Sequence, residues 1–200
     1  MNRLKVEEAL KHFLIEDIGD RDVSSVIFRE TDIGEAIVRF KEDGVIAGLH
    51  CFKWGYGLLD EGVKVELLKS DGDYVKSGEA IVRLTGPVAS LLSGERVLLN
   101  LVQRMSAIAT LTAQCVETLG SSRTRIVDTR KTTPGLRMFE KYAVRAGGGF
   151  NHRIGLYDAV MLKDNHIAAA GSITKAVDNV RASLGHMVMI EVEVETEQQL

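Results

Sequence analysis

The hydrophobic pattern of the first 110 residues predicts a mixed region of helices and strands. Apolar residues recur at helical spacing over 4–15 and turn-forming residues follow them, so an amphipathic helix is expected there. Alternating apolar and polar positions over 33–40 and 63–67, and a short apolar stretch over 44–47, predict strands. Together these elements indicate an α+β domain.

Residues 70–81 place turn-forming residues around Gly72 and Gly78, between short apolar segments. This stretch resembles half of a biotinyl or lipoyl hammerhead domain. A carrier of that kind needs a lysine on a tight hairpin between two such halves, and the sequence contains neither that hairpin nor a second half. The resemblance therefore indicates a hammerhead-like β scaffold and not a carrier.

The pattern changes after a long helical stretch. Residues 88–119 are rich in helix-forming residues, and Ser93 and Gly94 are expected to break them into two helices. The second of these helices is expected to lead into a new domain. We therefore predict an N-terminal α+β domain over 1–110 and a second domain over 111–200.

The second domain repeats a pattern of strand, loop and helix. Ser172 is expected to cap a helix that runs to about residue 184, and Thr196 to start another. The expected strands, which are short and apolar, cover 125–128, 159–162 and 187–194. Three such repeats in series predict a parallel sheet, and the fold class is α/β with an incomplete parallel α/β barrel in this second domain.

Composition narrows the class of protein. The chain has 25 Lys and Arg against 28 Asp and Glu, a net charge of −3, and 45% hydrophobic residues, which is typical of a globular protein. No apolar stretch approaches the roughly 20 residues that a bilayer requires, so no membrane contact is expected. The N-terminus becomes acidic where a signal peptide would become apolar, which predicts a cytoplasmic location. Cys51 and Cys115 are isolated in sequence and are expected to be buried, inert thiols.

The charges are distributed unevenly along the chain. Residues 123–163 contain nine basic and three acidic residues, although the whole chain is acidic. Arg137, Lys141 and Arg145 are spaced four apart and are expected to form a solvated helix face, whereas 130–131 and 152–153 flank loops where side chains can converge. This basic segment predicts an anion site. Nucleic acid is not expected as a partner, because aromatic residues do not alternate with these charges.

Charged residues follow the expected parallel strands, at 128–131, at 163–165 and at Glu191 and Glu193. In such folds the chemistry lies at the carboxyl ends of the strands. Cations there suit a polyanionic substrate, and carboxylates beside them suit a divalent metal that binds phosphate oxygens. The sequence has no Walker A loop, and the glycines at 147–149 follow an expected helix, so neither an ATPase nor a dinucleotide site is indicated.

Several motifs in this segment resemble those of the quinolinate phosphoribosyltransferase family, also called nicotinate-nucleotide pyrophosphorylase (carboxylating). They occur in the same order over about a hundred residues. They are GERVLLN at 94–100, DTRKTTPGLR at 128–137, EKYAV at 140–144, GGG at 147–149, NHR at 151–153, LKDNH at 162–166 and IEVEV at 190–194.

The resemblance implies an enzyme of NAD biosynthesis, a glycosyltransferase of the pentosyltransferase class. Its substrates would be quinolinate and phosphoribosyl pyrophosphate, and its products nicotinate mononucleotide, pyrophosphate and carbon dioxide. The resemblance also implies Mg²⁺ as cofactor and a homodimer or higher oligomer.

Site residues follow from the same resemblance. Arg130 and Arg153 would bind the quinolinate carboxylates, because guanidinium groups bind carboxylates in a planar, two-pronged geometry. His152 and Lys163 would assist them, and the partner subunit would contribute Arg96 across the interface. Lys131 would lie near the substrate phosphates, and Glu193 near the ribose and the metal. Of these residues, the catalytic ones would be Lys131, Lys163 and Glu193.

Simpler interpretations of some of these residues stay open. Arg96 would also suit an ordinary surface ion pair, and His166 suits a core or capping position better than a catalytic one. One of Glu191, Glu193 and Glu195 is expected to be merely solvated, since they are two residues apart on one strand face. The aromatic residues at 52, 54 and 56 are expected to pack in the core.

The chain departs from the family pattern in two ways. Ala107 stands where the family usually has glycine, and the sequence stops at Leu200 where the family's barrel continues, so we expect a C-terminal truncation. One alternative is a molybdenum-associated homologue of the same fold with another substrate. Another is a non-catalytic fragment or binding module, which would explain 71–81 but not the basic segment.

Overall fold

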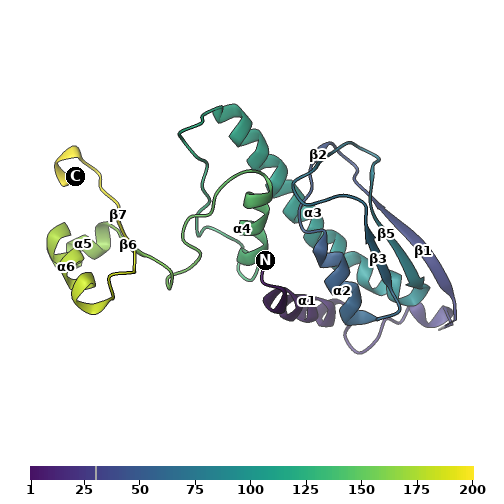
Figure 1. The fold of residues 1–200 in the computed structure, drawn as a ribbon. Coiled ribbons are helices and arrows are strands. Elements are labelled where there is room, and N and C mark those ends of the chain that lie inside the picture. The colour runs from purple at the N-terminus through teal and green to yellow at the C-terminus, as the bar shows by residue number, and fades with distance from the viewer. Residues whose placement is uncertain (30) are drawn as a thin grey trace. The chain divides into compact units, whose positions relative to one another are not determined.

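The computed structural model describes residues 1–29 and 31–200, which form two units (Figure 1). The N-terminal unit comprises residues 1–128 and 132–151, and the C-terminal unit comprises residues 129–131 and 152–200.

Helix α1 (Arg3–Ile18) opens the N-terminal unit and confirms the predicted amphipathic helix. The Asn2 side chain accepts a hydrogen bond from the Lys5 backbone N–H, which satisfies one of the free donors of the first turn. Val6, Leu10 and Leu14, spaced four apart, form its buried stripe. Gly19 ends the helix with a φ of 59°, a conformation that glycine adopts without steric cost.

An antiparallel sheet follows, with the strand order β1-β5-β3. Its strands are β1 (Ile33–Arg39), β3 (Lys64–Leu67) and β5 (Ala80–Pro87). A two-stranded pair joins β2 (Gly44–Val45) to β4 (Tyr74–Val75), and β4 lies within the stretch that resembles a hammerhead. The strand predictions for this half of the chain are thus confirmed, with the exposed and half-buried positions of β1 alternating as the sequence pattern predicts.

Helix α2 (His50–Leu59) places the predicted aromatic residues in the core. Phe52 and Tyr56 are fully buried, and the Tyr56 hydroxyl donates a hydrogen bond to the Leu91 carbonyl at 2.9 Å. Trp54 is partly buried against this core. A short 3₁₀ turn, η1 (Ser25–Ile27), precedes the sheet.

Helix α3 (Val88–Leu119) is continuous for 32 residues, so the predicted break at Ser93 and Gly94 is wrong. A β-carbon at Gly94 would lie 2.7 Å from Leu59 Cδ1 and 2.7 Å from Tyr56 Cε1. Glycine is therefore present at this position because α2 packs closely against α3, and not because the helix ends there. The expected domain boundary between residues 110 and 111 falls inside this helix.

Helix α4 (Arg137–Ala146) completes the N-terminal unit and packs against α3 (Figure 1). Phe139 is buried, with its ring centroid 6.0 Å from that of Phe13 in α1. The strand predicted over 125–128 is wrong in the part of the chain described, because only a single parallel bridge forms there, between Val127 and Phe150. A strand needs successive hydrogen-bonded pairs with its neighbour, and a single bridge does not provide them.

The C-terminal unit contains a small parallel α/β arrangement. Ser172 caps α6 as predicted, accepting a hydrogen bond from the Lys175 backbone N–H at 3.2 Å. The helix predicted to start at Thr196 is a short 3₁₀ turn, with Thr196 as its N-cap. The elements of this unit are β6 (Val160–Leu162), α5 (Asp164–Ala170), α6 (Ile173–Ser183), β7 (Ile190–Val192) and η2 (Glu197–Gln199).

Strands β6 and β7 pair in parallel, which confirms the α/β class, although the described residues form no closed barrel. The strands are shorter than the ranges predicted at 159–162 and 187–194. No helix within the described residues is long and apolar enough to span a bilayer.

The two cysteines differ from one another. Cys51 is fully buried as predicted, and burial, together with the nearby Asp71 charge, raises the pKa of its thiol to about 12. Cys115 lies exposed on α3, so the prediction of a buried thiol is wrong there.

Candidate active site

Parallel pairing brings the ends of β6 and β7 to one edge of the C-terminal unit. Val160 pairs with Ile190 and Leu162 with Val192, and the Glu193 N–H donates to the Leu162 carbonyl at 2.8 Å. Lys163 and Glu193, the next residues along each strand, therefore emerge side by side. Lys163 Nζ lies 2.6 Å from Glu193 Oε2.

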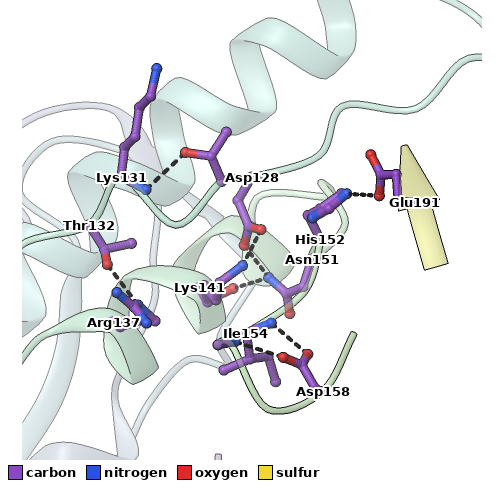
Figure 2. Close-up of polar contacts among 12 residues, drawn as sticks. Asp128, Lys131, Thr132, Arg137, Lys141, Asn151, His152, Ile154, Asp158 and Glu191 are labelled. Atoms are coloured by element: carbon purple, nitrogen blue, oxygen red, sulfur yellow. Dashed lines mark hydrogen bonds and ion pairs between the residues drawn. The ribbon is translucent and has the colours of Figure 1, made fainter. Parts of the chain in front are cut away.

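A second side-chain contact involves β7 itself. His152 Nε2 lies 2.7 Å from Glu191 Oε2, as Figure 2 shows. The neighbouring Arg153 is half-buried and donates from Nη1 to the Ala159 carbonyl at 3.2 Å, just before β6 begins. His152 and Arg153 of the predicted NHR motif thus each contact one of the two parallel strands or the residue before it.

Arg130 and Lys131 belong to the same unit. Arg130 is half-buried and Lys131 is exposed, and the Lys131 N–H donates to Thr129 Oγ1 at 3.1 Å, which tightens the turn (Figure 2). The C-terminal unit thus contains every predicted site residue except Arg96. Arg96 is exposed on α3 in the N-terminal unit.

The carboxylates of the site occupy distinct positions. Glu191 and Glu193 are both exposed and contact His152 and Lys163 respectively, and Glu195 is exposed as well. His166 has a capping role, as expected, because its Nδ1 accepts a hydrogen bond from the Lys163 backbone N–H at 3.1 Å. That bond fixes the start of α5 directly after β6.

Sequence reasoning missed the role of Lys141. The predicted solvated face of α4 is wrong at this position, because the Lys141 side chain is 5% exposed and forms an ion pair with Asp128. Asn151 Nδ2 donates to Asp128 Oδ2 at 2.6 Å and to the Lys141 carbonyl at 2.8 Å (Figure 2). Four-residue spacing cannot distinguish a solvated cation from a buried one that has a distant partner.

A second missed network joins α3 to the loop before α4. Arg104 donates to Glu140 Oε1 from Nε at 2.9 Å and to Thr133 Oγ1 from Nη2 at 2.6 Å, and the Thr133 N–H donates to Glu140 Oε2 at 3.2 Å. Burial alone would raise the pKa of Glu140, but the hydrogen bonds from Arg104 and Thr133 outweigh it and hold the pKa below its usual value.

Two models of known families match nearly the whole chain. The N-terminal domain model of quinolinate phosphoribosyl transferase matches residues 22–106, and the C-terminal domain model matches residues 108–200. The chain belongs to the quinolinate phosphoribosyltransferase family. The family, fold class and enzyme class predicted from the motifs are thereby confirmed.

Curated relatives match the chain over most or all of its length. The chain is 57% identical over its full length to a probable nicotinate-nucleotide pyrophosphorylase [carboxylating] of Bacillus subtilis, of which it spans 69%. It is 49% identical to the Synechocystis protein of that name, of which it spans 64%, and 46% identical to the chloroplastic rice enzyme, of which it spans 50%.

Solved structures agree with this assignment. The crystal structure of NadC from Streptococcus pyogenes matches all of the chain with a TM-score of 0.95 and 46% identity, and the chain covers 71% of it. The nicotinate-nucleotide pyrophosphorylase of Francisella tularensis matches with a TM-score of 0.92 and 36% identity, and the chain covers 70% of it.

Ala107, noted above as standing where the family usually has glycine, lies on α3 three residues after Arg104. Ala107 is exposed on α3, so its methyl group does not enter the buried side of the helix. The substitution therefore leaves the core packing of α3 unchanged.

The carboxylates of the site suit a metal that binds mainly through its substrate. The described residues contain no group of three or more His, Cys, Asp or Glu side chains that could hold a metal ion. Mg²⁺ commonly binds through one or two carboxylates and completes its shell with water and substrate phosphates. Glu193, an exposed carboxylate at the strand edge, fits that second mode and not a dedicated protein cage.

Proposed function

We propose that the protein transfers the phosphoribosyl group of phosphoribosyl pyrophosphate to quinolinate and decarboxylates the product. The reaction would yield nicotinate mononucleotide, pyrophosphate and carbon dioxide, a step of NAD biosynthesis. The observation that carries the proposal is the edge formed by β6 and β7, where Lys163 and His152 are each paired with a carboxylate, in a chain of this family.

Quinolinate has two adjacent carboxylates, which match the cations of the C-terminal unit. Arg130 and Arg153 would bind them in two-pronged contacts, and His152 and Lys163 would add further donors. Lys163 forms an ion pair with Glu193, and His152 contacts Glu191. The substrate carboxylates would replace those glutamates as partners of the two side chains.

Phosphoribosyl pyrophosphate would bind beside quinolinate. Lys131, exposed on its turn, would contact the phosphates, and Glu193 would lie near the ribose and Mg²⁺. When bound, Mg²⁺ would neutralise charge on the departing pyrophosphate. Because the ribose carbon becomes cationic as the leaving group departs, the protein's part is positioning and charge stabilisation, with no side-chain nucleophile.

Decarboxylation would follow the transfer. Loss of carbon dioxide would leave an electron pair on a ring carbon, which the new positive charge on the ring nitrogen stabilises until the carbon takes up a proton from solvent to give nicotinate mononucleotide. The cations that bind the substrate carboxylates, Lys163 among them, would add to that stabilisation.

We further propose a homodimer or higher oligomer in which the partner subunit supplies Arg96, and a cytoplasmic location. The exposure of Arg96 on α3 supports its role at an interface. The described chain contains no membrane-spanning helix, which is compatible with that location.

A product assay tests the reaction. The protein is incubated with quinolinate, phosphoribosyl pyrophosphate and Mg²⁺, and nicotinate mononucleotide is detected by mass spectrometry. We expect product, and we expect its loss when Mg²⁺ is chelated. Absence of both product and quinolinate binding would favour the molybdenum-associated homologue with another substrate, and covalent modification of a lysine in the intact protein would favour a carrier.

A further inference from the structure

Two segments of the proposed quinolinate site begin at residues that contact each other. Asp128 directly precedes 129–131, which includes Arg130, and Asn151 directly precedes 152–153. Asn151 Nδ2 donates to Asp128 Oδ2 at 2.6 Å. The two segments are 20 residues apart in sequence, yet their starting points are joined by this hydrogen bond (Figure 2).

Lys141 of α4 contacts both of these residues. Its ammonium group pairs with Asp128 Oδ1, while its backbone carbonyl accepts the second N–H of the Asn151 amide at 2.8 Å. The side chains of Lys141 and Asp128 are 5% and 8% exposed. We call these three residues, Asp128, Lys141 and Asn151, the anchor.

The backbone supports the anchor. The Asp128 N–H donates to the Phe150 carbonyl at 3.1 Å, and the Phe150 N–H donates to the Ile126 carbonyl at 2.9 Å. Arg145 donates from Nη1 to the Gly149 carbonyl at 2.9 Å and lies over the Phe150 ring. The last residues before each segment are therefore held by both main-chain and side-chain contacts.

A buried ion pair is weak evidence for stability, since desolvation offsets much of the attraction. Its geometry is better explained by specificity, because a charge pair with an amide shared between its members tolerates little displacement. Displacing one reactant-binding group by about 1 Å can cost on the order of 100-fold in rate.

We propose that Asp128, Lys141 and Asn151 are positioning residues that fix the separation of the two quinolinate-binding segments. This inference rests on the proposed function, because the segments matter as a pair only if both bind one substrate. None of the three residues is assigned a contact with substrate.

The first test replaces Asn151, which removes the shared amide and leaves the Lys141–Asp128 pair intact. For Asn151→Ala we expect kcat/KM for quinolinate to fall about 10-fold to 100-fold, mainly through KM, with an unchanged urea unfolding midpoint. The matched control is Asn179→Ala, an exposed asparagine on α6, which should behave as wild type. Wild-type kinetics in Asn151→Ala would overturn the proposal.

The second test separates positioning from stability. Lys141→Met alone leaves Asp128 buried without its cation and is expected to lower the unfolding midpoint. The double variant Asp128→Leu/Lys141→Met removes both charges, so the midpoint should return toward that of wild type while the quinolinate KM stays raised at least about 10-fold. A KM that returns to normal together with stability would mean a purely structural role and would overturn the proposal.

A readout that needs no turnover distinguishes this inference from the proposed function. Hydrogen exchange should become faster at 129–131 and at 152–153 together in Asn151→Ala, and at neither in Asn179→Ala. If the wild-type protein forms no nicotinate mononucleotide, the proposed function fails while the exchange result still decides whether the anchor couples the segments. Exchange unchanged at both segments would overturn the coupling.

Discussion

The two units of the molecule differ in how much apolar surface they bury. Among the described residues, the buried hydrophobic side chains lie in the N-terminal unit, apart from Leu162 and Ala176. The C-terminal unit instead contains six of the seven residues proposed to bind substrate, which are Arg130, Lys131, His152, Arg153, Lys163 and Glu193. Most of the hydrophobic stabilisation therefore comes from one unit, while the other contains most of the proposed site.

This contrast has a physical origin. Charged side chains at a binding edge must stay near solvent to meet their ligand, so the segments that carry them cannot bury much apolar surface. We infer that such segments need neighbouring residues to hold them in place. In the anchor, Asp128 would hold the segment 129–131 and Asn151 the segment 152–153. Four predictions test how complete the division is, in order of decreasing effect.

The largest effect is expected from the core of the N-terminal unit. Phe139→Ala removes a ring that is 1% exposed and should lower the free energy of unfolding by about 3–5 kcal/mol. Met187→Ala, at a position 86% exposed in the C-terminal unit, should change it by less than about 0.5 kcal/mol. Urea denaturation measures both, and equal losses would contradict the division.

Removing either arginine proposed to bind the substrate carboxylates should affect the reaction and not the fold. Arg130→Ala or Arg153→Ala should lower kcat/KM about 100-fold or more, since each loses charge-assisted hydrogen bonds of roughly 1.5–3 kcal/mol. Arg181→Ala, at an exposed position on α6, is the control. Near-normal turnover in either active-site variant, measured by product formation, would refute the assignment of that arginine.

The close approach of α2 and α3 gives a smaller effect with a clear sign. Gly94→Ala should destabilise the protein by about 1–3 kcal/mol, because the new methyl group would meet Leu59 and Tyr56. Gly57→Ala, in α2 with nothing within 4 Å of the new β-carbon, should stabilise it by about 0.4–1 kcal/mol. Thermal unfolding of the pair checks both signs, and a stabilising Gly94→Ala would show that the helices can separate.

The Arg104–Glu140 contact should give the smallest of the four destabilising effects, and one that depends on pH. Glu140→Gln should cost about 1–2 kcal/mol of stability at pH 7. The pKa of Glu140 is lowered in the folded state, so the stability it contributes is present above the usual value of 4.5 and is lost as the pH falls through the lower folded value. The difference between wild type and variant should therefore shrink below pH 4.5. A difference independent of pH would mean that Glu140 acts through packing alone.

Much of the fold could be predicted because local pattern decides it. The alternation in β1, the stripe of α1 and the cap at Ser172 each depend on residues close in sequence. The Gly94 prediction failed because glycine has two meanings, a helix end or a close helix contact, and only the neighbouring α2 distinguishes them. The strand expected over 125–128 failed for a related reason, since a strand needs a ladder partner and Phe150 supplies a single bridge.

The site divides along the same line. That Lys163 and Glu193 meet could be predicted, because residues that follow parallel strands emerge at one edge. The burial of Lys141 could not, because its partner Asp128 lies 13 residues away and nothing in the spacing of α4 points to it. The pairing of Arg104 with Glu140 spans 36 residues and was missed for the same reason.

The continuity of α3 bears on how this protein can be taken apart. The two family models meet at residue 107, between Met105 and Ala109, both of which are fully buried in this helix. Helix α3 packs against α1, α2, β1, β2 and β5, which precede residue 107, and against α4, which follows it. Splitting the gene between the two matched regions would give one polypeptide that ends with part of α3 and another that begins with the rest of it. Each would expose part of the buried apolar face of that helix. The boundary between the two family models thus does not coincide with a boundary between packed elements, because α3 continues through it.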